Sequence, residues 1–504
     1  MSYSFPGTDG GASWLVVASV VPTALCLIIW KLWNMHNHSL RDMTCSLPLP
    51  PGSMGLPLLG ESLHFVAMGA NFYRKRLKSY GGVSKTNILG NPTILVLGAK
   101  NVRKILMGET SLVASYWPQS VRTLMGEGTV SHSEGPTHKT RRKSIVKAFN
   151  HAALSSYLLE SQDIFRFYIN RWCRQGTVLG FEECKKLSLR FACHVLIGFQ
   201  ISEKELGQLI ELYAVFSDGL FSIPLKIPGS GFHKGMVARE KLMEKIGEFL
   251  DRRKEWSGAP DALTYMMKQS EEELSRKELK EVAMELLLTG HVTAGSAACS
   301  LLLYLGRNRE VLDKVVEELR QHNMYDDVGG LTLEQLGQLK YVSNVVKEVV
   351  RIAPPVGGGF RKALKTFELD GYQVPKGWTV AFSIREAQEQ SDIFPDGDKF
   401  DPDRWDDMTM EREHFFPFGA GRRVCVGKEL GKLMLKIFVV ELAINCRWNL
   451  LNEYPVIEEM PVPRPVDGLP AVFSSLQKLG ILKRRPKSID LAAKIPSTNS
   501  YLYR

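Results

Sequence analysis

A ten-residue stretch near the C-terminal end, residues 418–427, constrains this chain more than any other segment. It fits the pattern F-x-x-G-x-R-x-C-x-G, with a single cysteine, Cys425, between Gly421 and Gly427. Glycine permits backbone conformations and close approaches that a Cβ atom would block, so such a loop can lie against a flat group with its amide N–H groups aimed at the sulfur. Those donors and the guanidinium of Arg423 favour the thiolate over the thiol. The alternative is a buried structural cysteine, and the five fixed positions of the pattern argue against it.

Three charged residues upstream of this loop stand in an order that one enzyme family shares. Glu348 and Arg351 form an E-x-x-R pattern, whose i, i+3 spacing puts both side chains on one helix face, and Arg404 follows within residues 400–405. With the cysteine loop, these motifs resemble the cytochrome P-450 superfamily of haem-thiolate monooxygenases. The resemblance implies the cytochrome P-450 fold, mainly α with a small β portion. In that fold Glu348, Arg351 and Arg404 form a network that supports the haem from below.

The same resemblance implies haem b as the cofactor, with Cys425 as the axial ligand of its iron. A thiolate ligand pushes electron density into iron and favours cleavage of the O–O bond. Residues 134–143 match the family's C helix, where His138 and Arg142 share one face at i, i+4 spacing and are expected to bind the haem propionates. The residues expected to hold the cofactor are Cys425, His138, Arg142, Phe418, Gly421, Arg423 and Gly427.

Residues 286–294 resemble the oxygen-activating stretch of the family's long I helix. Gly290 is expected to let the helix open near the iron. The hydroxyl of Thr293 is expected to act as the catalytic group that bonds dioxygen and relays protons. The alternative for Thr293 is a helix threonine bonded back to a carbonyl. The usual acid position holds Val292, so protons must arrive through water or through His291.

Several stretches resemble one branch of the superfamily, the retinoic acid hydroxylases of cytochrome P-450 family 26, more closely than the superfamily at large. These stretches are residues 49–57, 101–109, 117–122, 358–361, 365–372 and 426–430. By this resemblance an apolar pocket takes a long, flat polyene, which aromatic walls suit through area burial and ring contact. The residues expected to line the pocket are Trp117, Phe221, Leu288 and Phe360, each with ordinary core packing as its alternative.

The carboxylate end of such a substrate is where this chain departs from the branch. Arginines occur there in the strand corresponding to residues 90–98, whereas this chain has Asn91 and Leu95. A buried carboxylate needs a charged or hydrogen-bonding partner. Arg122, close to Trp117, is the best remaining cation, with a solvent-facing position as its alternative.

The function expected from these motifs is hydroxylation of an apolar isoprenoid acid, with all-trans retinoic acid as the first candidate. Two alternatives stay open: a related enzyme that oxidises or rearranges another lipid, sterol or terpenoid, which Val292 would suit, and a non-catalytic protein that sequesters retinoids. Electrons are expected from an NADPH-dependent flavoprotein reductase that docks on a basic patch, although such a patch can also be a solvated helix face. The cations of the patch are Lys139, Arg141, Lys143 and Lys147. The net charge of +10 would also suit nucleic acid, but no recognised module supports such binding.

The N-terminal region contains an uncharged run, residues 14–30, whose length meets the lower bound of about 17–25 residues for a membrane-spanning helix. Lys31 and Arg41 follow the run and Asp9 precedes it, which predicts a body on the cytoplasmic side. A cleaved signal peptide is the alternative, but no basic segment precedes the run. We therefore expect a single-pass protein of the endoplasmic reticulum membrane. The expected segments are a lumenal N-terminus (1–12), an anchor (13–33), a linker with a proline-rich hinge (34–60), a haem-thiolate catalytic domain (61–484) and a loose tail (485–504).

Hydrophobic periodicity predicts most of the regular structure. The expected helices are 138–149, 154–174, 206–218, 234–256, 277–307, 339–352 and 426–446, with two strands within 84–98 and a hairpin at 371–378. A hydrophobic fraction of 44% with 23% charged residues is typical of a folded globular chain. Eight cysteines without paired spacing indicate reduced thiols rather than disulfides.

Overall fold

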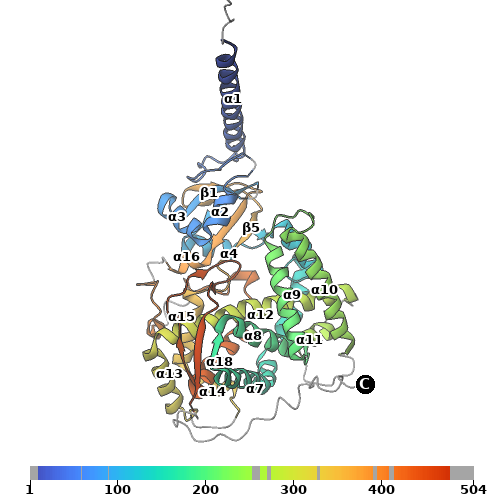
Figure 1. The fold of residues 1–504 in the computed structure, drawn as a ribbon, viewed down its shortest axis with the longest axis vertical. Coiled ribbons are helices and arrows are strands. Elements are labelled where there is room, and N and C mark those ends of the chain that lie inside the picture. Colours follow the sequence, from blue (N-terminus) through green and yellow to red (C-terminus); the bar gives the residue numbers. More distant parts are fainter. Residues whose placement is uncertain are drawn as a thin grey trace, which may run out of the picture.

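The computed structural model has a sheet-containing part beneath a projecting N-terminal helix, and a larger helical part beside and below it (Figure 1). The structure describes residues 9–57, 59–88, 90–252, 261–269, 274–325, 330–389, 394–407 and 414–476. The expected C-terminal tail and most of the expected lumenal N-terminus lie outside the described residues.

Helices make up most of the described chain, as the sequence pattern predicts. In chain order they are α1 Asp9–Ser39, α2 Ser62–Met68, α3 Ala70–Tyr80, α4 Ala99–Met107, α5 Gln119–Met125, α6 Gly135–Lys147, α7 His151–Gln175, α8 Gly180–Ile197, α9 Glu203–Leu220, α10 Gly231–Arg252, α11 Ala262–Gln269, α12 Arg276–Arg307, α13 Arg309–Gln321, α14 Leu333–Gln338, α15 Lys340–Ile352, α16 Ile384–Glu389 and α18 Lys428–Asn445, with the short 3₁₀ helices η2 Pro402–Asp406 and η4 Gly421–Arg423.

The strands form one mixed five-stranded sheet and three smaller groups. They are β1 Val83–Ile88, β2 Asn91–Val96, β3 Val113–Ser115, β4 Thr177–Leu179, β5 Gly358–Ala363, β6 Phe367–Leu369, β7 Tyr372–Val374, β8 Thr379–Ser383, β9 Cys446–Leu450, β10 Ile457–Glu458, β11 Arg464–Pro465 and β12 Pro470–Ser475. The large sheet has the order β1-β2-β8-β5-β3, in which only β2 and β8 run parallel. The small groups are β4-β12-β9, β10-β11 and β6-β7.

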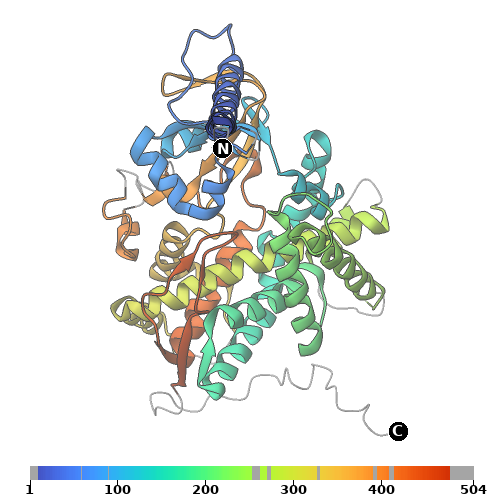
Figure 2. The same cartoon turned by 45° about the horizontal axis from the view of Figure 1, so that its top comes forward.

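The long helix α12 crosses the helical part and packs most extensively against α8 (Figure 2). It starts at a capping box, in which the Ser275 hydroxyl accepts from the Glu278 N–H and the Glu278 side chain accepts from the Ser275 N–H. Among the described residues it is the one helix that is long and apolar enough to cross a membrane. However, 72% of its most apolar 18-residue stretch is buried inside the protein. A helix that is apolar on all sides and buried is a core helix. The shorter apolar segment Val20–Trp33 lies within α1.

The expected helices and the expected pair of strands are present, with end shifts of a few residues, but the predicted hairpin is displaced. The last residues of the expected helix 234–256, from 253 on, lie outside the described residues. Strand β6 pairs with β7 across a turn at Asp370 and Gly371, so the hairpin begins before residue 371. Both turn residues have positive φ, 47° and 79°, which a tight two-residue hairpin turn requires. The helices α8 and α13 and several shorter ones, such as α3 and α4, were not predicted, although α13 carries an apolar stripe at helical spacing.

The segment between α1 and α2 is fastened to the sheet-containing part. Gln373 connects to it at several points: its N–H donates to the Pro48 carbonyl at 2.9 Å, its side-chain oxygen accepts from the Asp42 N–H at 2.9 Å, and its side-chain N–H₂ donates to the Leu47 carbonyl. The indole of Trp378 donates to the Leu40 carbonyl at 3.1 Å. Residues 40–48, part of the expected linker after α1, are therefore hydrogen-bonded to the body, and we call this segment the strap.

Candidate active site

The cysteine loop lies between η4 and α18, so Cys425 stands just before a long buried helix. Its N–H donates to the Phe418 carbonyl at 2.8 Å, which closes the loop. Gly421 has a φ of 65°, and an added Cβ there would lie 2.6 Å from the carbonyl oxygen of Leu106 in α4. Both conditions require glycine. A Cβ on Gly427 would instead meet no protein atom within 4 Å, so this residue borders open space.

Cys425 is one of only two exposed cysteines among the eight, all of which are free thiols. Desolvation by the surrounding protein nevertheless raises the pKa of its thiol, while the Gly427 N–H and the charges of Arg142 and Lys428 oppose the rise. A thiol that is both accessible and desolvated lies in the wall of a recess, and a metal ion bound there would deprotonate it. The main cations that favour the thiolate are therefore Arg142 and Lys428, not the expected Arg423.

Three arginines and one carboxylate gather beside this loop. Arg142 of α6 donates to the Val424 carbonyl at 2.6 Å. Arg423 donates through Nε to Oε1 of Glu109 at 3.1 Å, and Nε of Arg361 in β5 lies 3.1 Å from Oε2 of the same carboxylate. Three guanidinium groups against one carboxylate leave two positive charges in excess.

These residues fit the cofactor that the sequence implies. Haem carries two propionates, and charge-assisted hydrogen bonds from arginine are the usual partners of such groups. His138 adds no charge at neutral pH, because burial and the charges of Arg423 and Arg142 lower the pKa of its imidazole to about 4. The residues suited to hold haem are Cys425 at the iron and Arg142, Arg361, Arg423 and His138 at the propionates. Arg361 was not predicted, since one arginine in a strand carries no distinguishing sequence signal.

Two threonines in the middle of α12 face an open space. Thr289 and Thr293 are accessible although the helix around them is largely buried, and residues four apart share a helix face. Thr293 donates to the Thr289 carbonyl at 2.8 Å, and Thr289 donates to the Glu285 carbonyl at 2.8 Å. The alternative considered for Thr293, a hydroxyl bonded back to a carbonyl, is what the structure contains, and its oxygen can still accept hydrogen bonds. We call Thr289 and Thr293 the hydroxyl stripe.

Thr289 was missed in the sequence, although a signal for it existed. It occupies the first position of the oxygen-activating pattern, where the family usually has alanine or glycine. That departure, like Val292, could have drawn attention to it.

The neighbouring Gly290 and His291 turn away from the hydroxyl stripe. A Cβ on Gly290 would overlap the end of the Leu196 side chain of α8, so the glycine allows close packing of the two helices, and α12 runs through this position without interruption. The imidazole of His291 is buried against Tyr213, with ring centroids 4.9 Å apart, and its Nδ1 bonds the Leu287 carbonyl at 2.6 Å. Burial lowers the pKa of His291 to about 4, so a neutral ring on the far side of the helix is not placed to relay protons.

The charged residues of the E-x-x-R motif form a buried network with Arg404. The fully buried carboxylate of Glu348 accepts from Arg351 at 2.8 and 2.9 Å and from Arg404 Nε at 3.0 Å. It also accepts from the Trp405 indole at 2.9 Å and the Asp401 N–H at 3.1 Å. The structure thus brings together all three residues that the sequence placed in this network.

The expected substrate residues divide between the interior and the surface. Leu288 is buried, and Trp117 and Phe360 are partly buried against core clusters. Phe221 is 50% exposed at the end of α9, and Arg122 is exposed on α5. The structure therefore places Phe221 on a surface loop and not in the interior.

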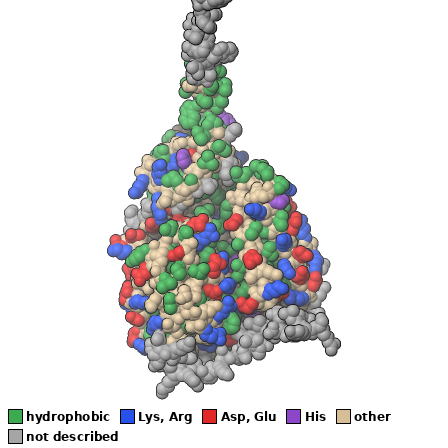
Figure 3. Space-filling view, in the orientation of Figure 1, with side chains coloured by type: hydrophobic (Ala, Val, Ile, Leu, Met, Phe, Trp, Pro, Cys, Tyr) green, Lys and Arg blue, Asp and Glu red, His purple; other side chains and the backbone are tan. Residues whose placement is uncertain are grey.

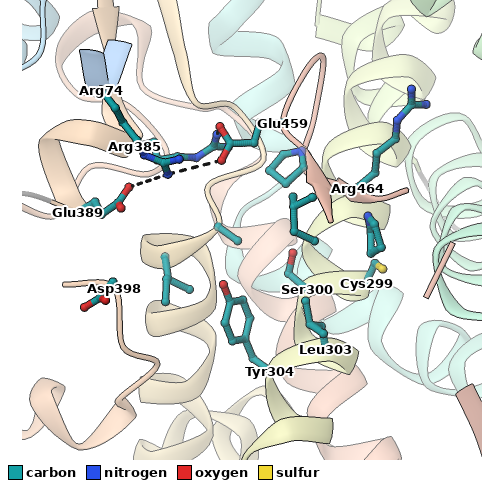
Figure 4. Close-up of a pocket in the computed structure, with 15 residues that line it drawn as sticks. Arg74, Cys299, Ser300, Leu303, Tyr304, Arg385, Glu389, Asp398, Glu459 and Arg464 are labelled. Atoms are coloured by element: carbon teal, nitrogen blue, oxygen red, sulfur yellow. Dashed lines mark hydrogen bonds and ion pairs between the residues drawn. The ribbon is translucent and has the colours of Figure 1, made fainter. Parts of the chain in front are cut away.

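A separate pocket of about 190 Å³, with several charged residues in its lining, lies beside the C-terminal half of α12 (Figure 4). Arg74 pairs with Glu389 at 3.2 Å, and Arg385 pairs with Glu459. Because these charges neutralise each other, neither guanidinium is a spare partner for a substrate carboxylate.

Comparison with known proteins gives one consistent family. A model of the cytochrome P450 family matches residues 50–465. Cytochrome P450 26A1 of Danio rerio is 42% identical over 475 residues, covering 90% of this chain and 96% of the relative. Cytochrome P450 26B1 of Homo sapiens is 40% identical over 491 residues, covering 94% and 96%. A solved structure, described as retinoic acid bound cyanobacterial CYP120A1, has a TM-score of 0.80 and 32% identity, and covers 86% of this chain and 100% of that chain. The chain belongs to the cytochrome P450 family of monooxygenases, whose haem iron is held by a cysteine thiolate.

Proposed function

We propose that this monooxygenase hydroxylates retinoic acid. The observation that carries the proposal is the identity of 40–42% to cytochromes P450 26A1 and 26B1 over at least 90% of both chains. Family 26 is the retinoic acid hydroxylase branch that the sequence motifs resemble. The likeness to a retinoic-acid-bound structure at a TM-score of 0.80 supports the same class of substrate.

The residues around the recess suggest how this chain serves the reaction. Bound haem supplies dioxygen activation with electrons from a reductase, and the protein supplies orientation and proton handling. Thr293 is the proposed catalytic residue. Its oxygen and that of Thr289 can both accept hydrogen bonds from a water, which would carry protons into a site where Val292 replaces the usual acid.

The substrate is proposed to lie along the interior apolar residues. Leu288, Trp117 and Phe360 suit contact with a polyene chain, because burial of apolar area drives binding of such a ligand. Phe221 is proposed at the access side, where its exposed ring meets an incoming apolar molecule. Arg122 is proposed to pair with the carboxylate and would have to turn inward from its exposed position on α5.

We further propose that α1 anchors the protein in the endoplasmic reticulum membrane as a single span. Most of its described apolar side chains project from the body, and Leu25 and Ile28 are 56% and 55% exposed (Figure 3). The loop between α9 and α10, with Ile223 and Ile227 exposed, lies at the same end of the molecule (Figure 1). Such surfaces are stable when lipid covers them. Lys31 on the body side of the span favours a cytoplasmic catalytic domain.

The electron donor is proposed to be an NADPH-dependent flavoprotein reductase that docks beside α6. Lys139, Lys143 and Lys147 are exposed on this helix, which reaches the cysteine loop through Arg142. Arg141 is already engaged, because it pairs with Glu278 at 2.7 Å. An acidic donor surface would be steered by the exposed lysines.

The proposal is tested with the full-length protein and a flavoprotein reductase in lipid vesicles. We expect NADPH-dependent formation of hydroxylated all-trans retinoic acid, detected by mass spectrometry, and no product from Cys425→Ala. A haem spin-state shift without any product would favour a retinoid-sequestering protein. Turnover of a sterol or another lipid, with none of retinoic acid, would favour the related oxidising or rearranging enzyme.

A further inference from the structure

Glu109 is a buried carboxylate that the haem-binding motifs do not include. It lies in the turn between α4 and β3 and is only 4% exposed. Its Oε1 also accepts from the Ser115 N–H at 3.1 Å, which ties the side chain to the end of β3. A buried charge of this kind requires partners, and here its two charged partners are arginines beside the cysteine loop.

The contacts of Glu109 are made to the Nε edge of each guanidinium group. Arg423 Nε donates at 3.1 Å, and Arg361 Nε lies at 3.1 Å in a charge contact that is not a well-aligned hydrogen bond. The terminal nitrogens have backbone partners: Arg423 donates to the Ser133 carbonyl at 3.0 Å, and Arg361 to the Phe360 carbonyl at 2.9 Å. Each arginine has five N–H donors, so this arrangement leaves donors on both for a further anion.

Glu109 also joins segments that are distant in the sequence. It connects the turn after α4 with the cysteine loop through Arg423 and with β5 through Arg361. The carboxylate neutralises one of the two charges, and it holds both groups at a fixed separation. Without it, two buried cations would face each other, and like charges repel.

We propose that Glu109 is a positioning residue for the haem propionates, which sets the place of Arg361 and Arg423 and adds one negative charge beside the cofactor. Two effects follow and can be separated. Position governs how long haem is retained, while charge governs the reduction potential, because a nearby negative charge opposes the addition of an electron.

The test uses three variants of the full-length holoenzyme. Glu109→Gln removes the charge and turns an amide N–H₂ toward one arginine. Glu109→Asp keeps the charge but shortens the side chain by about 1.5 Å, so it cannot reach both Nε atoms. Glu441→Gln is the matched control: Glu441 is also buried and also pairs with an arginine Nε, that of Arg166 at 3.1 Å, but on the side of α18 that packs against α7.

Haem loss to an apo-globin acceptor and the potential from spectroelectrochemistry are the readouts, with thermal unfolding recorded for every variant. We expect both Glu109 variants to lose haem about 10- to 100-fold faster than wild type. Only Glu109→Gln should also show a more positive potential, and Glu441→Gln should change stability alone. Wild-type haem retention in Glu109→Asp would overturn the positioning role. A potential in Glu109→Gln equal to that of the control would overturn the electrostatic role.

Discussion

The sharpest test of the fold beneath the haem is the substitution Glu348→Gln. The carboxylate accepts five hydrogen bonds, four of them from Arg351, Arg404 and the Trp405 indole, at 2.8–3.0 Å. An amide of the same shape keeps one oxygen but directs N–H groups at donors. Two buried guanidinium groups are then left without their anion, and removing one partner of a buried pair costs about 3–5 kcal/mol.

This loss is large against a domain stability of about 5–15 kcal/mol. We expect chemical denaturation of the ferric protein to show the decrease, with partial loss of the thiolate-type Soret band of the ferrous carbon-monoxide complex at moderate temperature. The control is Asp403→Asn in η2, whose pair with Lys314 is about half exposed and should contribute about 0–1 kcal/mol. If both variants lost the same small amount, the buried network would not be the structural support inferred here.

The other predictions address the site directly. Cys425→His should abolish the thiolate-type Soret band while the fold is retained, and an unchanged band would remove Cys425 as the ligand. Val292→Glu should lower peroxide release per NADPH consumed, and an unchanged release would show that water at the hydroxyl stripe already supplies enough protons. Arg122→Ala should weaken binding of retinoic acid far more than of retinal in spin-state titrations, and equal losses would exclude Arg122 as the carboxylate partner. His291 has a folded pKa of about 4 against 6.5, so the unfolded state binds its proton more tightly and stability falls by up to about 3 kcal/mol between pH 6.5 and pH 4. His291→Phe should remove that part of the pH dependence in urea unfolding.

The parts of the site that could be predicted are those in which chemistry imposes a short local pattern. Gly421 must be glycine because of its positive φ and its contact with Leu106, and Glu348 and Arg351 share a face because they are three residues apart. Such constraints are visible within ten residues of sequence. They identified the ligand loop, the network and the mainly helical fold.

The parts that were missed depend on contacts between distant segments. Glu109 contacts Arg361 and Arg423, which are more than 250 residues away in the sequence. No local sequence pattern pairs Glu109 with either arginine. The same holds for His291, whose environment is decided by Tyr213 on another helix. Phe221 is exposed next to a helix end, and its expected contact with the substrate stays a prediction.

The binding of the strap to the sheet-containing part has a mechanical consequence. Hydrogen bonds from Trp378 and Gln373 to residues 40–48 leave little freedom between helix and body. A spanning helix adjusts to bilayer thickness by tilting. If α1 spans the bilayer as proposed, the stiff junction makes the body tilt with it and raises or lowers the α9–α10 loop relative to the lipid surface. The thickness of the surrounding bilayer would then act as a control on how readily a lipid-dissolved molecule reaches the interior.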